Sequence, residues 1–294
     1  CELTRGNLRL RFPRRDLANM FAIPATPVDA PQATLDRDAL LKPLLFLATS
    51  SRTESPQYTK HTCVLGSDGT AASTDGALFA VTSGPQLPFP MSLRCRDVKP
   101  LGRWLGFVAT QLGEGNFPIT ITHISVDRFA GKYRISAGGD EHVIYVPEAN
   151  PGPLRQIVGA DRQSHIVCSG QVQREALVNT AKLFGGKRIQ RRIVCQFQPL
   201  IDVVGRLHIW QKQPNGRPSD SELILAEFSK ADPAIDLPAF EVAVRPLVKA
   251  LERFSTTHVE LTYRARFHRL GIRINANHPA EVFLRVNPAR VPYD

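Results

Sequence analysis

Residues 257–286 read THVELTYRARFHRLGIRINANHPAEVFLRV, and this stretch decides the fold because an earlier stretch repeats its plan. It contains three short runs rich in β-branched and apolar residues, at 259–262, 271–274 and 281–286. Runs of the same order and spacing lie about 140 residues earlier, at 119–122, 132–135 and 142–147. The runs largely alternate apolar with polar side chains, and turn residues separate them, as is typical of antiparallel strands with one buried face. We therefore predict two matching three-stranded meanders.

An amphipathic helix is predicted before each meander. In the first half Asp97 is a good N-cap, and apolar residues recur at helical spacing over 98–112. In the second half Pro238 suits the first position of a helix whose apolar stripe runs over 240–254. Pro246 lies inside that stripe and should kink the helix. The two halves thus share a helix followed by a meander.

A further helix is predicted earlier in each half, over 36–48 with Asp36 as its cap, and over 173–184. More strand-like runs lie between the helices, at 61–65, 77–81, 193–197, 203–210 and 223–228. Each half is thus an α+β unit with two helices on one face of antiparallel sheet. We predict an N-terminal extension and linker over 1–33, a first domain over 34–158 and a second over 159–294.

The composition excludes several classes of protein. With 43% hydrophobic and 22% charged residues, the chain is globular in composition rather than disordered or fibrous. No run approaches the roughly 18–20 apolar residues of a membrane-spanning helix, and the first residues do not form a secretory signal. The five cysteines lack CxxC spacing, which favours reduced thiols and argues against zinc. We expect a cytoplasmic protein without a membrane contact or a metal.

The charge favours an anionic partner, and the motifs argue against catalysis. A net charge of +10 is consistent with nucleic-acid binding, although many basic proteins bind none. The eight histidines form no HxxxH or HxH spacing, and no nucleophile elbow is present. Gly185-Gly186-Lys187-Arg188 lacks the spacing of a phosphate-binding loop. We expect neither a catalytic site nor a cofactor.

Three segments carry a resemblance to one family. The run 36–44, DRDALLKPL, resembles the first helix of bacterial DNA polymerase III beta sliding clamps, and 72–80, ASTDGALFA, resembles a strand turn common in them. The end, 286–291, VNPARV, resembles their closing Met-Pro-x-Arg segment. The segments occur in the family's order within a duplicated architecture, over roughly 34–294. The chain is therefore similar to DNA clamps, with two clamp domains where the bacterial proteins have three.

The resemblance implies a sliding clamp, a processivity factor that encircles double-stranded DNA and tethers replication proteins without catalysing a reaction. Two-domain clamps close as trimers, so we expect a homotrimeric ring, with a dimer as the alternative. A DNA polymerase and a clamp loader are the expected partners, and the nucleoid is the expected location. The competing hypothesis is a DNA-binding replication protein that forms no ring, either an open processivity factor or a plasmid-type initiator. The initiator should contain a compact helix-turn-helix, and the sequence has none.

In the family the helices line the central hole, so basic side chains on helices are the expected DNA contacts. Arg245, Lys249 and Arg253 follow at i, i+4 and i+8 along one helix, and Lys99 and Arg103 do the same on the matching helix. The whole predicted set is Arg52, Lys99, Arg103, Arg174, Lys182, Lys187, Arg188, Arg245, Lys249 and Arg253. An ordinary solvated surface is the alternative interpretation.

The resemblance also implies an apolar docking pocket for the polymerase and loader, between domains and bordered by the C-terminal segment. Leu177, Val286, Pro288 and Val291 are the residues predicted to form it. The alternative interpretation is that these residues only close the last sheet.

Overall fold

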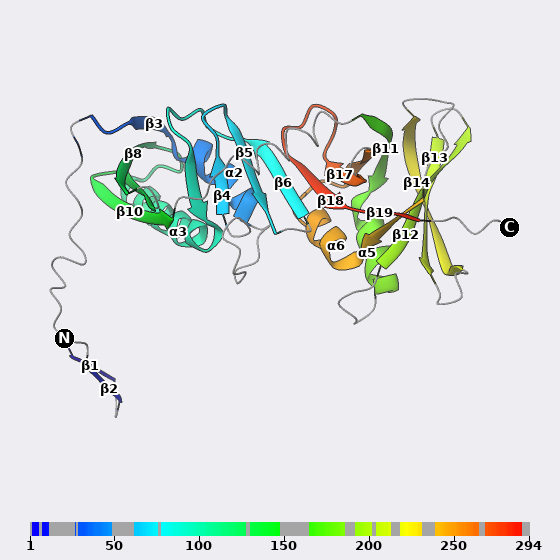
Figure 1. Cartoon of the computed structure of the whole chain (residues 1–294), viewed down its shortest axis with the longest axis horizontal. Helices are drawn as coiled ribbons and strands as arrows, with labels where there is room; N and C mark the ends of the chain where they lie inside the picture. The colour runs from blue at the N-terminus through cyan, green and yellow to red at the C-terminus, as the bar shows by residue number, and fades with distance from the viewer. Residues whose placement is uncertain are drawn as a thin grey trace.

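The computed structural model describes residues 2–5, 8–11, 27, 29–48, 62–75, 78–127, 130–147, 165–185, 192–201, 204–212, 218–230, 239–264 and 268–289. Two α+β units lie next to each other along the long axis (Figure 1). We call the described residues of 29–147 unit 1 and those of 165–289 unit 2. The N-terminal segment also carries a hairpin of β1 (Glu2–Arg5) and β2 (Leu8–Arg11).

Unit 1 contains one pattern twice: a strand, a helix and a three-stranded meander. The first copy is β3 (Gln32–Asp36), α2 (Arg37–Ala48), β4 (Thr62–Leu65), β5 (Thr70–Thr74) and β6 (Leu78–Ser83). The second copy is β7 (Met91–Arg94), α3 (Cys95–Leu112), β8 (Pro118–Asp127), β9 (Ala130–Ala137) and β10 (Asp140–Pro147).

Unit 2 contains the same pattern twice again. The first copy is β11 (Ile166–Gln173), α5 (Arg174–Gly185), β12 (Arg192–Ile201), β13 (Val204–Lys212) and β14 (Pro218–Lys230). The second copy is β15 (Ala239–Ala243), α6 (Val244–Leu251), β16 (His258–Arg264), β17 (Arg269–Arg273) and β18 (Glu281–Arg285), followed by the short β19 (Asn287–Ala289). The repeat therefore occurs within each unit as well as between units.

The strand before each helix pairs with the meander of the other copy in its unit. In unit 1, β3 pairs with β8 and β7 pairs with β4, which gives the order β10-β9-β8-β3 for one sheet. In unit 2, β11 pairs with β16 and β15 pairs with β12. β11 also pairs with the end of β14, which joins the two sheets of unit 2. This exchange of strands ties the two copies of each unit together.

A strand of unit 2 completes a sheet of unit 1. β18 pairs antiparallel with β6, with Phe283 opposite Phe79, so that a 13-stranded sheet passes through the junction. The guanidinium of Arg269 lies over the Phe79 ring, with 5.0 Å between its central carbon and the ring centroid. Phe283 is fully buried, so the junction combines backbone pairing with an apolar contact.

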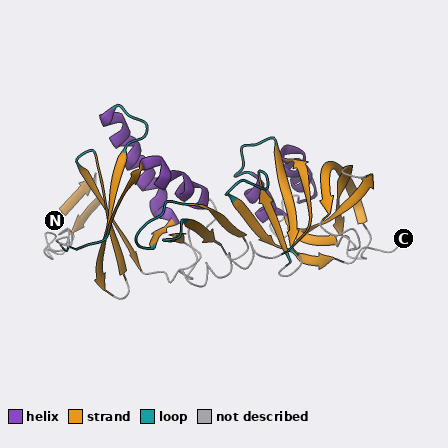
Figure 2. Ribbon diagram, turned by 90° about the horizontal axis from the view of Figure 1, so that it is seen from above, coloured by secondary structure: helices purple, strands orange, loops and turns teal. Residues whose placement is uncertain are grey.

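Each helix packs its apolar face on the sheets, and Figure 2 shows the helices of each unit beside its strands. On α3, Val98, Leu101, Leu105 and Val108 are each no more than 1% exposed. Full burial of such side chains contributes roughly 1.5–3 kcal/mol each. The opposite face of the helix is left open to solvent. The 3.6-residue period of apolar residues thus decides which side chains the helix presents outward.

The meanders confirm the strand predictions, while two of the predicted helix starts were wrong. The six runs predicted to form two meanders are strands of β8 to β10 and β16 to β18. Asp97, however, does not cap a helix: α3 begins at Cys95, after Arg94 in an extended conformation without a side-chain cap bond. α6 begins at Val244 rather than at Pro238, because 239–243 form β15, whose residues 240–243 pair with β12. Strand pairing therefore overrides the local capping signals.

The strands without a prediction include β3, β5 and β11. The segment 70–74 consists of small residues and Thr, and 166–173 contains a glycine, so neither carries a clear alternation. β3 begins at Gln32 and belongs to a sheet of unit 1, although 1–33 were expected to lie outside both repeats. The domain boundaries themselves remain predictions. Within the described residues, no helix has the length and apolar character to cross a membrane.

Candidate nucleic-acid interface

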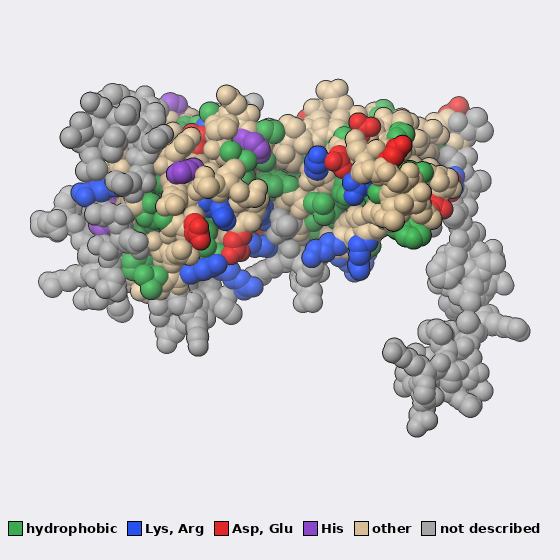
Figure 3. Space-filling view, turned by 180° about the vertical axis from the view of Figure 1, so that it is seen from behind, with side chains coloured by type: hydrophobic (Ala, Val, Ile, Leu, Met, Phe, Trp, Pro, Cys, Tyr) green, Lys and Arg blue, Asp and Glu red, His purple; other side chains and the backbone are tan. Residues whose placement is uncertain are grey.

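Exposed cations lie along the outer face of α3. Arg96, Lys99 and Arg103 are all exposed, and their spacing places them on the face opposite the buried apolar residues. Arg96 lies 3.8 Å from the Asp97 carboxylate, measured from Nε to Oδ1. Figure 3 shows Lys and Arg side chains gathered along the lower edge of the molecule, the side on which Figure 1 draws α3, α5 and α6. Lys99 and Arg103 thus stand where the prediction placed them.

Arg96 was missed by the sequence prediction. The helix was expected to start at Asp97, so Arg96 was not counted among its residues. Since α3 starts at Cys95, Arg96 lies in its first turn and in line with Lys99. The side chain of Arg96 is 62% exposed, so it extends the cationic row by one turn.

On α6 only one of the three predicted cations is free of the unit junction. Arg245 is exposed, whereas Lys249 turns toward unit 1, with its Nζ 3.7 Å from Asp75 Oδ2. Burial lowers the pKa of Lys249, against the opposing attraction of Asp75. Lys249 therefore forms an ion pair with Asp75 that links the two units.

Arg253 does not extend the α6 row, which corrects the predicted i, i+4, i+8 arrangement. α6 ends at Leu251, and all three guanidinium nitrogens of Arg253 are buried without a hydrogen-bond partner among the described residues. Its guanidinium carbon lies 6.0 Å from the centre of the Phe46 ring of unit 1. Burial lowers the pKa of Arg253 to about 10. A side chain enclosed at the junction is poorly placed to meet phosphate.

On α5 both predicted cations make contacts within unit 2. Arg174 donates a 2.8 Å hydrogen bond from Nε to the carbonyl oxygen of Thr256, and is half-buried. Lys182 pairs with Glu252 at 3.0 Å, and both side chains are more than half exposed. An exposed pair of this kind contributes little stability and can be exchanged for another anion. The remaining predicted cations, Arg52, Lys187 and Arg188, lie outside the described residues.

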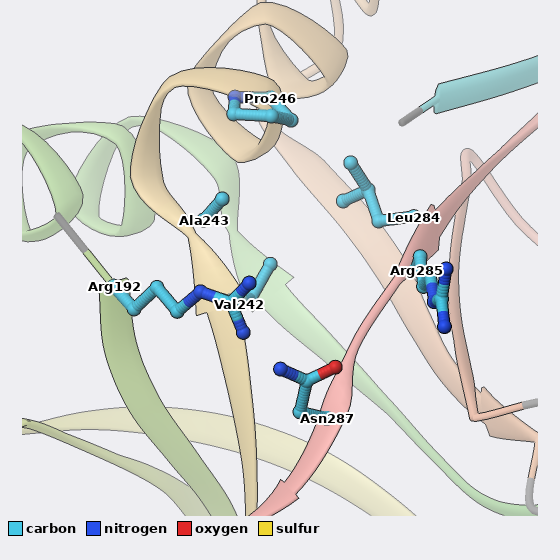
Figure 4. A pocket seen from close by; sticks show the side chains of 7 residues that line it. All are labelled: Arg192, Val242, Ala243, Pro246, Leu284, Arg285 and Asn287. Atoms are coloured by element: carbon cyan, nitrogen blue, oxygen red, sulfur yellow. The ribbon is translucent and has the colours of Figure 1, made fainter. Parts of the chain in front are cut away.

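A pocket of about 460 Å³ opens in unit 2 between the start of α6 and the strands β15, β18 and β19 (Figure 4). Its lining residues are Arg192, Val242, Ala243, Pro246, Leu284, Arg285 and Asn287. Apolar side chains from three elements form its walls, and two arginines stand at its sides (Figure 4). Arg192 lies 3.8 Å from Glu241, measured between Nη1 and Oε2, with its side chain 51% exposed. Such a pocket suits a short apolar segment with acidic neighbours.

None of the predicted docking residues that the structure describes lines this pocket. Leu177 and Val286 are buried in the core, at 1% and 2% exposure, and Pro288 is exposed on β19 opposite Phe240. Val291 lies outside the described residues. The C-terminal segment does contribute, through Asn287. Pro246 and Leu284 carried no sequence signal for a pocket, because the pocket forms only where separate elements meet.

Among the described residues no group of three or more His, Cys, Asp or Glu side chains could hold a metal ion. Cys63 and Cys95 lie 3.3 Å apart between their sulfur atoms, and both are buried thiols. Their mutual hydrogen bond and their burial raise the pKa of Cys63 well above its usual value.

The arrangement defines a class of protein: tandem clamp-type units, with helices and exposed cations on a common side and a continuous sheet through the junction. No protein-family model matches the chain, and no curated protein matches it in sequence. Solved structures do match it. The DNA polymerase III subunit beta of Pseudomonas aeruginosa has a TM-score of 0.66 and 15% identity, covering 98% of this chain and 74% of that one.

Two further structures are similar to the same extent. The Bartonella birtlesii sliding clamp bound to griselimycin has a TM-score of 0.66 at 14% identity, covering 99% of this chain and 74% of that one. The C. crescentus beta sliding clamp, with polyethylene glycol at its proposed beta-motif tethering region, has a TM-score of 0.65 at 13% identity, with the same coverage. At these identities the likeness establishes the fold. The chain has the fold of bacterial DNA polymerase III beta sliding clamps.

Proposed function

We propose that this chain is a DNA sliding clamp: a processivity factor that surrounds double-stranded DNA and holds replication proteins on it. The observation that carries the proposal is the row of exposed cations on α3, together with Arg245 on α6, on the common helix side of a clamp-type fold. The similar structures are those of sliding clamps, the beta subunits of DNA polymerase III. The exposed cations of this chain provide the positively charged surface that DNA binding requires.

The proposed DNA contacts are Arg96, Lys99 and Arg103 on α3, Arg245 on α6, and Lys182 on α5 after release from Glu252. Side chains of this type attract phosphate and do not discriminate between bases. Binding should therefore be independent of sequence, and strongly weakened by salt. Diffuse contacts of this kind hold the duplex in place while still allowing it to move through the ring. The role requires no catalytic group, cofactor or metal, and places the protein at the nucleoid in the cytoplasm.

The pocket in unit 2 is the proposed docking site for a DNA polymerase or a clamp loader. Its walls of Val242, Pro246 and Leu284 can take apolar side chains of a peptide segment, while Arg192 and Arg285 can pair with carboxylates beside them. A site that takes a short peptide can be shared in turn by several partners, as a tethering protein requires.

The proposed assembly is a homotrimer of this 294-residue chain. Two units per chain and three chains give a ring of six units, because each copy would meet the next in the way that unit 2 meets unit 1. A dimer remains the alternative stoichiometry. A protein that binds DNA without closing a ring would instead be an open processivity factor.

Retention on closed DNA tests the proposal. The protein is incubated at low salt with a nicked circular plasmid, washed at high salt, and separated by gel filtration. A clamp should stay with the circle after the wash, and should leave when a restriction enzyme linearises the plasmid. Equal loss from circular and linear DNA would overturn enclosure, and binding that depends on sequence would favour an initiator.

A further inference from the structure

We propose that Phe107, near the end of α3, stacks on an unpaired base at the point where a DNA duplex gives way to a single strand. Arg96, Lys99 and Arg103 on the same helix hold the phosphates beside it. The inference rests on the proposed function, since it takes these cations as a DNA contact, and it adds the kind of DNA that the contact prefers.

α3 is longer than its counterpart in unit 2. It follows β7 and has 18 residues, whereas α6 follows β15 in the same place of the repeat and has 8. The next strand, β8, begins 23 residues after the start of α3, while β16 begins 14 residues after the start of α6. Unit 2 builds the same arrangement of strands without the additional turns. Residues 103–112, which we call the α3 extension, are therefore not required by the sheets.

Phe107 stands on the same face of α3 as the cations. Arg96, Lys99, Arg103 and Phe107 are all exposed, and steps of three, four and four residues keep them in line along a helix. The buried Leu105 lies on the opposite side. The side chain of Phe107 is 59% exposed. The row of cations thus ends in an exposed aromatic ring.

The surface around Phe107 is open, and the helix beneath it is anchored. A methyl group added to Gly106 would meet nothing within 4 Å, so no neighbouring side chain crowds this side of the ring. Trp104, one turn before Phe107, is half-buried and stacks on His142 of β10, with 5.1 Å between the ring centroids. Because this stack and the buried Val108 hold the α3 extension to unit 1, Phe107 is presented from a fixed position.

The charge of the surrounding surface favours an anionic chain as the partner of Phe107. Three exposed cations lie in line with the ring, and the sequence contains no Asp or Glu between Val98 and Gly113. Nucleic acid combines this negative charge with flat base faces. Stacking of a base on an aromatic side chain tolerates every sequence, because each base has such a face.

The position of the ring favours an unpaired base over a paired one. Inside a duplex each base face is covered by the neighbouring base pairs, so an aromatic side chain gains little there, whereas an unpaired base leaves its face free. Along the helix axis Arg103 lies roughly 10 Å from Arg96, and Phe107 lies roughly 6 Å further on. Phosphates of one duplex strand are roughly 3.4 Å apart along the axis. The cations therefore cover about three phosphates before the ring is reached.

Binding to two matched DNA molecules tests the inference. One is a labelled blunt duplex, and the other is the same duplex with a short single-stranded thymidine extension. Fluorescence anisotropy at low salt gives the affinity for each. We expect the wild type to bind the extended DNA about tenfold more tightly, which is the order of magnitude that one stacked base supplies. Equal affinities of the wild type for both molecules would overturn the inference.

Substitutions of Phe107 separate stacking from the charge of the extra phosphates. Phe107→Ala should remove most of the preference and leave the affinity for the blunt duplex unchanged. Phe107→Trp keeps a flat ring and should keep the preference, whereas Phe107→Leu is apolar without a ring and should lose it. Leu45→Ala is the matched control, because Leu45 is also an exposed apolar residue, at 42%, on α2, and should keep the preference. The same preference in Phe107→Ala as in the wild type would show that the ring takes no part.

Photochemical cross-linking locates the contact. With 5-iododeoxyuridine at the first unpaired position, irradiation should join the DNA to the peptide that contains Phe107, as identified by mass spectrometry. Cross-links confined to unit 2 would contradict the inference. A second copy of the chain is the competing partner of the ring. A lower mass of Phe107→Ala in sedimentation equilibrium would assign Phe107 to a contact between copies and overturn the stacking role.

The outcomes distinguish this inference from the proposed function. If Phe107→Ala binds both DNA molecules like the wild type, and the wild type stays on circular DNA, the stacking role is wrong and the clamp function stands. If the wild type leaves circular and linear DNA equally, but its preference for the extended DNA depends on Phe107, the stacking role stands and the clamp function fails.

Discussion

Gly271 on β17 leaves the space that a buried ion pair occupies. Arg264 donates from Nη2 to Glu281 Oε1 at 3.1 Å, and the two side chains are only 4% and 7% exposed. A methyl group at Gly271 would meet both the Thr262 hydroxyl and the Glu281 carboxylate. A buried carboxylate that loses its partners destabilises the fold. Position 271 therefore requires glycine, because Thr262 and Glu281 leave no room for a larger side chain.

We expect Gly271→Ala to lower the free energy of unfolding by about 2–3 kcal/mol, since it overpacks this site and displaces Glu281. Urea denaturation measures the loss. Gly106→Ala is the matched control: nothing lies within 4 Å of its added methyl, and it sits inside α3. That control should stabilise the protein by roughly 0.5–1 kcal/mol. Equal effects of the two substitutions would contradict this explanation.

His142 should make the stability depend on pH. Burial lowers its pKa, against the opposing attraction of Asp97. A histidine with a lowered pKa in the folded state binds its proton more readily when unfolded, so its contribution is present above the usual value of about 6.5 and is lost as the pH falls below it. We expect the melting temperature to fall between pH 7 and 5 by less in His142→Phe, which keeps the aromatic stack with Trp104. The same fall in both proteins would exclude His142 as the cause.

At the scale of the element, α3 is the helix on which the proposed DNA contact depends. We expect Lys99→Ala with Arg103→Ala to weaken binding to all duplex sequences alike, and to reduce the slope of log affinity against log salt by about 2, because each phosphate contact contributes roughly 0.9. Fluorescence anisotropy at several salt concentrations measures both the affinity for DNA and its dependence on salt. Arg285→Ala, which removes an exposed cation from β18 instead, should leave the slope unchanged. A loss confined to some sequences would argue for base recognition.

Elements differ in how far the sequence could predict them. The period of Val98, Leu101 and Leu105 is local, so the helix and its exposed face followed from residue spacing. The start of α6 did not follow from residue spacing, because it depends on the pairing of β15 with the distant β12. Arg253 has helical spacing from Lys249, yet its guanidinium is enclosed by unit 1, which no spacing within α6 can indicate. The pocket at Pro246 and Leu284 escaped prediction for the same reason: its walls meet only in the folded chain.

At the scale of the molecule, β18 and β6 should couple the units. Because one sheet passes through both, we expect a single calorimetric transition for the whole chain. Phe283→Ala removes a fully buried ring at the junction, and should lower stability by about 3–5 kcal/mol and separate the transition into two. Ile121→Ala, buried within unit 1 away from the junction, should lower the melting temperature without separating it. Two transitions in the wild type would contradict the coupling.

The pairing of β6 with β18 also sets a waiting time during synthesis. Unit 1 leaves the ribosome with the edge of β6 bare, and Glu281–Arg285 follow only about 200 residues later. At translation rates of roughly 5–20 residues per second, the nascent chain carries that bare edge for some tens of seconds. An unpaired edge of Leu78, Phe79 and Val81 is a template for pairing with a neighbouring nascent chain. We therefore expect ribosome-bound chains that stall before residue 281 to recruit chaperones, and a gene fragment encoding unit 1 alone to yield inclusion bodies.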